Sequence, residues 1–79
     1  MSSERPFQRV QKRLVDDWKH PVGTPVIVHR DDGTELETVT ESMPWMLGAS
    51  SQSIGHTAVI SVQGISGGFL LERMRVGRP

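Results

Sequence analysis

The hydrophobic pattern of this 79-residue chain changes its period at Pro21. Before Pro21, apolar residues recur at helical spacing, at Phe7, Val10, Leu14 and Trp18. After it, short runs rich in β-branched residues are separated by turn residues, which is typical of strands. The change predicts an α+β fold, with one N-terminal α-helix followed by a small antiparallel sheet. A chain of this length is expected to form a single domain over residues 1–79.

The N-terminal helix is predicted over about residues 4–19. Ser3 is placed to cap it, and Pro6 is tolerated because the first helical turn does not need that N–H. The helix should end by His20, because Pro21 disfavours helical geometry in the residue before it. We expect its apolar stripe to pack against the sheet and its basic residues to lie on the opposite side.

Four later segments have strand character: Pro25–Arg30, Thr34–Ser42, Thr57–Gly64 and Phe69–Val76. Pro44 argues against a central strand between the second and third segments. The small, polar stretch at 49–55 is expected to be a mobile loop. Both faces of the last segment carry apolar residues, so it needs two covers. We expect the sheet to bend strongly into a β-barrel of four to five strands over about 22–76. The barrel interior would then bury one face of the last segment, and the N-terminal helix would bury the other.

The composition excludes several classes of site. Cysteine is absent, which removes disulfides, thiolate metal sites and cysteine nucleophiles. The net charge is zero, but residues 31–41 carry only acidic charges, and Glu35 and Glu37 alternate with Leu36 and Thr38. That alternation predicts a solvated acidic face. No apolar run approaches the roughly 20 residues of a membrane span, and no signal-peptide pattern is present, so we expect a cytoplasmic protein without membrane contact.

No convergent catalytic or metal-binding set is visible in the sequence. His20, His29 and His56 are far apart and lack the spacing of a zinc site. Ser66 lies between glycines, but in a strand-to-strand turn, whereas a hydrolase nucleophile needs a strand-to-helix turn. We therefore expect no metal, no cofactor and no enzymatic activity.

The bulky apolar segment around Trp45 is the leading candidate for a binding site. Trp45 and its flanking methionines form either a core plug or a partly exposed contact for another protein, and the sequence leaves both open. The neighbouring polar loop could become ordered on binding. The predicted contact residues of this protein-binding module are Met43, Trp45, Met46 and Gln52.

The alternative is a nucleic-acid-binding protein that uses the basic side of the helix. Arginine and lysine contact phosphates, but the solvated back of an amphipathic helix has the same composition. The neutral total charge also argues against strong non-specific binding. The candidate contact residues are Arg5, Arg9, Lys12 and Arg13 on the helix, with Arg73 and Arg75 near the C-terminus.

The segment Pro21–Val76 resembles an SH3-like small barrel. The resemblance is carried by the opening Val22–Val28, the turn Asp31–Gly33 and the closing Val59–Met74. It covers about three quarters of the chain and consists of a pattern of strands and turns. It implies a small, SH3-like β-barrel behind the N-terminal helix.

Two further resemblances concern origin and assembly. The motifs His20–Val26, Pro44–Gly48 and Gly64–Gly68 resemble those of small proteins carried by bacteriophages and mobile elements, which implies a bacterial or phage setting. Val62–Ile65 is similar to the pore-lining Val-Gln-Ile-Tyr of plasmid-borne type II dihydrofolate reductases, which are tetrameric SH3-like barrels. Here glycine interrupts that stretch and tyrosine is absent from the chain, so no catalytic residue carries over. The second alternative is thus an oligomeric small-barrel enzyme.

Overall fold

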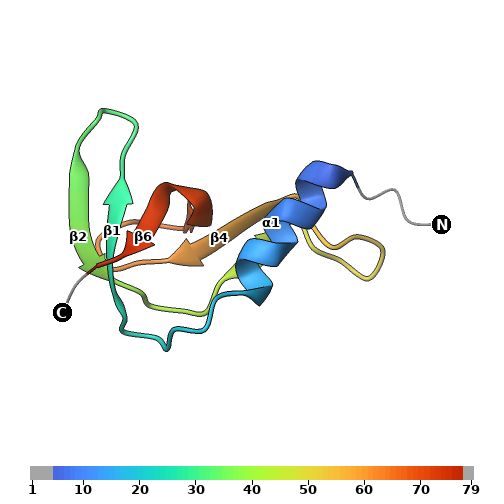
Figure 1. Ribbon diagram of the computed structural model, residues 1–79, viewed down its shortest axis with the longest axis horizontal. Helices are drawn as coiled ribbons and strands as arrows, with labels where there is room; N and C mark the ends of the chain where they lie inside the picture. The colour runs from blue at the N-terminus through green and yellow to red at the C-terminus, as the bar shows by residue number, and fades with distance from the viewer. Residues whose placement is uncertain (1–4, 78–79) are drawn as a thin grey trace.

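The computed structural model describes residues 5–77, which form one α-helix and six short strands (Figure 1). The strands make two antiparallel sheets of three strands each, with the orders β2-β1-β6 and β3-β4-β5. The predicted α+β class is therefore confirmed. In chain order the elements are α1 (Pro6–Asp16), β1 (Pro25–His29), β2 (Glu35–Val39), β3 (Trp45–Leu47), β4 (Thr57–Ser61), β5 (Gly68–Leu70), the 3-10 turn η1 (Leu71–Arg73) and β6 (Met74–Val76).

The two sheets are connected where the chain leaves β2. The N–H of Glu41 donates to the carbonyl of Ser61 at 2.8 Å, and the N–H of Gln63 donates to the carbonyl of Val39 at 3.0 Å. The chain from β2 to β3 thus runs alongside β4 and its extension. Across residues 5–77 the strands form two open sheets, so the closure expected of a four- to five-stranded barrel is not observed.

The last predicted strand is divided in two. The segment predicted as Phe69–Val76 contains β5, then η1, then β6. β5 pairs with β4, whereas β6 pairs with β1. The 3-10 turn moves the chain from one sheet to the other and buries Leu71 in the core. β3 begins directly after Pro44 and is an edge strand, a position where a missing N–H is tolerated.

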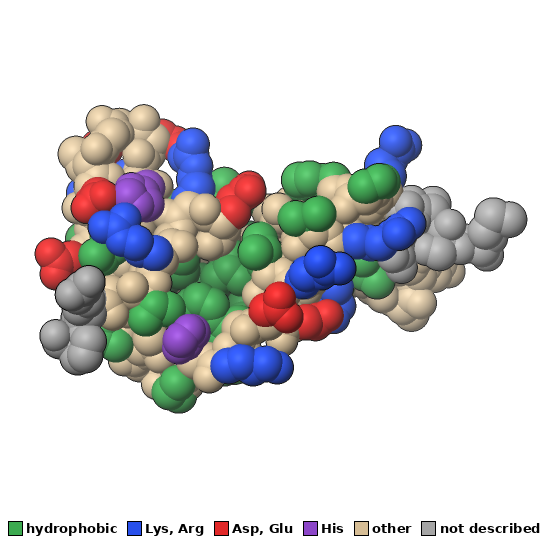
Figure 2. Space-filling view, in the orientation of Figure 1, with side chains coloured by type: hydrophobic (Ala, Val, Ile, Leu, Met, Phe, Trp, Pro, Cys, Tyr) green, Lys and Arg blue, Asp and Glu red, His purple; other side chains and the backbone are tan. Residues whose placement is uncertain are grey.

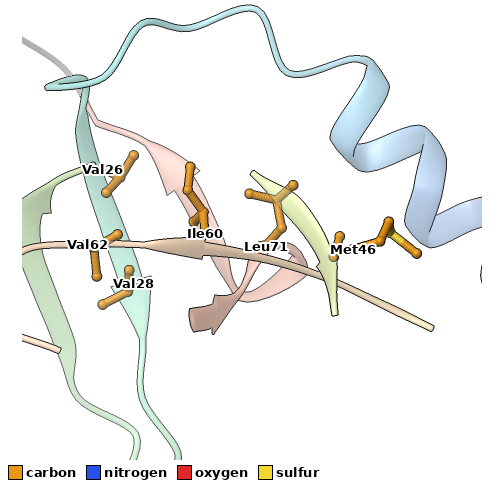
Figure 3. Packing of buried hydrophobic residues seen from close by; sticks show 7 residues of the cluster. Val26, Val28, Met46, Ile60, Val62 and Leu71 are labelled. Carbon is orange, nitrogen blue, oxygen red and sulfur yellow. The ribbon is translucent and has the colours of Figure 1, made fainter. Parts of the chain in front are cut away.

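One hydrophobic core lies between the two sheets, and Figure 3 shows side chains from β1 and from the β4 region within it. Val28 and Ile60 have no exposed surface. Full burial of an aliphatic side chain of this size contributes about 1.5–3 kcal/mol. The buried cluster consists of Val26, Val28, Met46, Ala58, Ile60, Val62 and Leu71.

α1 is shorter than predicted at both ends. It runs over Pro6–Asp16 instead of about 4–19, with Arg5 at the N-cap and Asp17 at the C-cap. The side-chain oxygen Oε1 of Gln8 accepts a hydrogen bond from the N–H of Arg5 at 2.7 Å, which satisfies a donor at the helix start. Ser3, the predicted cap, lies outside the described residues.

α1 packs on the core through a face that differs from the predicted stripe. Phe7 and Val10 are 54% and 60% exposed, whereas Gln11 is only 2% exposed. Leu14 and Trp18 are partly buried against the core, as predicted. The expectation that the whole apolar stripe faces the sheet is therefore wrong for its first half.

A buried hydrogen bond explains this orientation of the helix. The register between β4 and β5 ends at the pair Val59 and Leu70, after which the chain turns into η1. Ala58 is thus left without a partner strand on that side. Oε1 of Gln11 accepts a hydrogen bond from its N–H at 2.8 Å. An unpaired buried N–H costs about 1–3 kcal/mol, which is comparable to the burial of one aliphatic side chain, so this contact favours the observed orientation of the helix.

Candidate protein-contact surface

The chain that builds the β3-β4-β5 sheet carries no charged side chain. Between Ser42 and Leu71 the sequence has no Asp, Glu, Lys or Arg, and His56 is its only titratable residue. Depletion of charge marks the centres of protein interfaces. The sequence analysis centred on Trp45 and did not use this signal, which extends the candidate surface over a whole sheet.

Alternation along the three strands divides their side chains between the core and the outer side of the sheet. The side chains that face the core or pack against it are Met46, Ala58, Ile60 and Phe69. We call the outer side the uncharged face. It consists of Trp45, Leu47, Thr57, Val59, Ser61, Gly68 and Leu70.

Trp45 lies across the middle of the uncharged face. It is directly opposite Val59, which is in turn opposite Leu70. Atom Cζ2 of the indole is 3.2 Å from the position that a Cβ on Gly68 would occupy, and that position is also 2.9 Å from Val59. A larger residue at 68 would displace the indole. Trp45 is 38% exposed over a buried Val59, so it is both packed and available for contact.

The predicted protein-contact residues do not all reach the surface. Met43 is exposed, Gln52 is exposed in the neighbouring loop, and Trp45 is half-buried. Met46 is 6% exposed and belongs to the core cluster, because it points to the opposite side of β3 from Trp45. The structure therefore places this predicted contact residue in the core and not on the surface. Leu47, at 47% exposed, takes its place beside Trp45.

The loop at 49–55 is organised by its own serines. The N–H of Ser50 donates to the carbonyl of Ser53 at 2.9 Å, and Oγ of Ser53 accepts from the N–H of Gly55 at 3.1 Å. Nε2 of Gln8 donates to the carbonyl of Gly55 at 2.8 Å and ties the loop to the start of α1. The mobility of this loop stays a prediction.

The outer side of the other sheet is charged. Nη1 of Arg75 lies 2.8 Å from Nε2 of His29, and Nδ1 of His29 lies 3.2 Å from Oε2 of Glu35. The two ring nitrogens of His29 thus lie between an arginine and a glutamate. We call this the charged face; its residues are Ile27, His29, Glu35, Glu37 and Arg75.

The basic candidate residues are divided between two places. Figure 2 shows Lys and Arg side chains over α1 and, separately, over the β1–β2 end, with hydrophobic side chains between them. Lys12 pairs with Asp16 within the helix. Arg73 pairs with Asp31, and Arg75 contacts His29 and Glu35. Arg5, Arg9 and Arg13 are exposed on α1.

Residues 5–77 contain no group of three or more His, Asp or Glu side chains placed to hold a metal ion. In the same range, no helix combines the length and apolarity that crossing a membrane requires.

Nδ1 of His56 lies 2.8 Å from Oγ1 of Thr57, which places a polar pair at the rim of the uncharged face. Polar groups around an apolar centre are typical of interfaces.

No family model, curated protein or solved structure matches this chain. The resemblances to SH3-like barrels and to phage-borne proteins stay predictions from the sequence pattern. In the stretch similar to the reductase pore, Val62 is fully buried and Gln63 is exposed.

Proposed function

We propose that this protein is a non-enzymatic protein-binding module and that the uncharged face is its contact surface. One observation carries the proposal: a sheet without a single charge exposes Trp45 and Leu47 side by side on its outer side. Tryptophan is enriched among the residues that dominate binding energy, and charge is depleted around them. A contact of this composition fits another protein better than a nucleic acid.

The strand arrangement supports the SH3-like class as part of this proposal. The sheets β2-β1-β6 and β3-β4-β5 are joined at the end of β2, where Val39 and Glu41 hydrogen-bond to Gln63 and Ser61, so the chain bends from one sheet into the other. A strongly bent, barrel-like sheet requires such a connection. A bacterial or phage origin and a cytoplasmic location belong to the proposal through the sequence resemblance alone.

Site-specific photocrosslinking in the cells that make the protein tests this function. A benzoylphenylalanine at Leu47 should yield discrete protein adducts on illumination. The same label at Val10, which is similarly exposed on α1, is the matched control. Trp45→Ala should abolish the Leu47 adducts while far-UV circular dichroism stays unchanged. Equal adducts at both positions, or none at Leu47, would contradict the proposal.

The nucleic-acid alternative is less favoured, because Lys12, Arg73 and Arg75 are engaged by acidic or histidine partners. Titration with DNA and RNA at low and high salt tests it. Phosphate contacts would make affinity fall steeply with salt. We expect no salt-dependent binding; a steep fall would reinstate this alternative.

A further inference from the structure

We propose that the edge of β5 docks an extended, uncharged peptide segment, which adds to the β3-β4-β5 sheet as a fourth strand. This inference rests on the proposed function, because it names the kind of partner that the uncharged face would hold. Three features support it: the peptide groups of β5 that point away from the sheet, the charges on the β2 and β6 edges, and the small, apolar uncharged face.

The hydrogen bonds of β4 fix the direction of its peptide groups. The carbonyl of Ser61 accepts from the N–H of Glu41, and its N–H donates to Oγ of Ser42, so the peptide groups of Ser61 point towards the β2–β3 side. The N–H of Ala58 points the other way, to Gln11. Because these directions alternate along a strand, Ile60 also points towards β5.

This alternation leaves backbone groups of β5 unpaired. Ile60 is paired with Phe69, so the peptide groups of Phe69 face β4. Those of Gly68 and Leu70 point away from the sheet. By this alternation the N–H and carbonyl of Gly68 and the N–H of Leu70 face away from β4, and no turn or loop hydrogen bond within residues 5–77 reaches them. Such a row of groups is a template for another strand.

The other sheet edges are protected. β2 carries Glu35 and Glu37, and β6 carries Arg75, and charges on an edge strand oppose pairing with a further strand. At β3 the carbonyl of Met46 accepts a hydrogen bond from the N–H of Ala49, so the turn after β3 occupies an acceptor on that edge. β5 combines an uncharged edge with backbone groups that point away from the sheet.

The size of the uncharged face favours a peptide over a second copy of the chain. Three strands about 4.8 Å apart, with three to five residues at about 3.4 Å each, present an area of order 200 Å². A stable dimer needs about 800 Å² from each partner. A short extended segment needs less area, because hydrogen bonds to the open edge supply part of its affinity.

The chemistry of the face sets the sequence of the segment. Side chains of an added strand would alternate between the two sides of the sheet, and every second one would lie beside Leu70 and Trp45. A charged side chain there would lose water without gaining a counter-charge. The segment is therefore uncharged and carries apolar residues at alternate positions.

Proline at position 70 removes the donor while preserving the backbone. Leu70 has φ −59°, which is within the range that proline imposes, and Phe69 before it is in a strand, as proline prefers. Leu70→Pro therefore deletes one unpaired N–H without requiring a new conformation. Leu70→Ala, which keeps that N–H and shortens the side chain, is the matched control.

The probe is a phage-displayed library of random heptapeptides, from which the most enriched sequence is synthesised and titrated by calorimetry. We expect uncharged sequences with alternating apolar residues. Leu70→Pro should weaken binding about tenfold or more, and Leu70→Ala about threefold or less. If Leu70→Pro does not fold, hydrogen exchange of the wild-type amides is measured instead, and the peptide should protect Gly68 and Leu70.

Several results would overturn strand addition: no enrichment, enrichment of charged peptides, equal losses for both Leu70 variants, or unprotected amides at 68 and 70. A concentration-dependent dimer in sedimentation that Leu70→Pro abolishes would instead assign the edge to a second copy. If the photocrosslinks from Leu47 persist while any of these results is obtained, the proposed function stands and only the docking of a strand fails.

Discussion

The two sheets of this protein share one core but present opposite chemistry on their outer sides. On the β2-β1-β6 sheet, Glu35, His29 and Arg75 contact one another around Ile27. The β3-β4-β5 sheet instead carries Trp45 beside Val59, on a surface without charge. In the first sheet the charges keep the outer side solvated and its edges unpaired. The second sheet lacks this protection, which is why the proposed contact surface lies on it.

Removing a core residue is expected to have the largest effect, because it tests whether the two sheets form one unit. Ile60→Ala deletes fully buried groups and should lower the free energy of unfolding by about 2–5 kcal/mol. Ile27→Ala, on the half-buried charged face, should cost clearly less. Urea unfolding is followed by tryptophan fluorescence and by far-UV circular dichroism. Non-coincident transitions in the wild type would show that the sheets unfold separately.

Removing the Gln11 amide should cause the next largest loss of stability. Its hydrogen bond connects α1 to β4, in the sheet that carries the uncharged face. Gln11→Met keeps most of the volume but leaves the N–H of Ala58 unpaired, at a cost of about 1–3 kcal/mol. The partly exposed Gln8, replaced by Met, is the control and should cost less. An apolar residue at 11 that stabilised the chain in urea unfolding would contradict our account of the helix orientation.

The charged face illustrates what could be predicted from the sequence. The turn Asp31–Gly33 and the alternation of Glu35 and Glu37 with Leu36 are local patterns, and the structure has the hairpin with both glutamates exposed. The division of the last strand by η1 was not predictable in this way, because Phe69 to Val76 contains no glycine or proline that would mark a break. The division depends on which sheet each half reaches.

The candidate site shows a similar limit. Helical spacing predicted a buried stripe that includes Phe7 and Val10. The helix instead turns Gln11 towards β4, where its side chain accepts a hydrogen bond from the N–H of Ala58. A hydrophobic pattern contains no information about such a hydrogen bond. Trp45 was found from its bulk, whereas Met46 next to it proved to be core. Alternation along β3 places these two side chains on opposite sides of the sheet, but which of them faces the core depends on tertiary packing.

Removing the ionic contacts of the charged face is expected to lower the free energy of unfolding by less. Arg75→Ala removes the contacts to His29 and Glu35, but these side chains are about half exposed. Exposed ion pairs contribute about 0–1 kcal/mol, and we expect a loss in that range that shrinks in high salt. Trp45→Ala, measured in parallel by urea unfolding, should show no such salt dependence. A large loss on removing Arg75 would mean that the charges hold the hairpin in place.

The smallest change in stability is expected at the turn between β1 and β2. The hydroxyl of Thr34 donates to Oδ1 of Asp32 at 2.6 Å and its N–H donates at 3.0 Å; these bonds favour the carboxylate and hold the pKa of Asp32 below its ordinary value of 3.8. A lowered folded-state pKa stabilises the fold above the ordinary value, and this contribution is lost as the pH falls through the lowered one. The wild type should therefore be more stable than Asp32→Asn at neutral pH, with the difference fading in acid. In an NMR titration, Thr34→Val should return the midpoint of Asp32 towards its ordinary value. An unchanged midpoint would mean that Thr34 does not set this pKa.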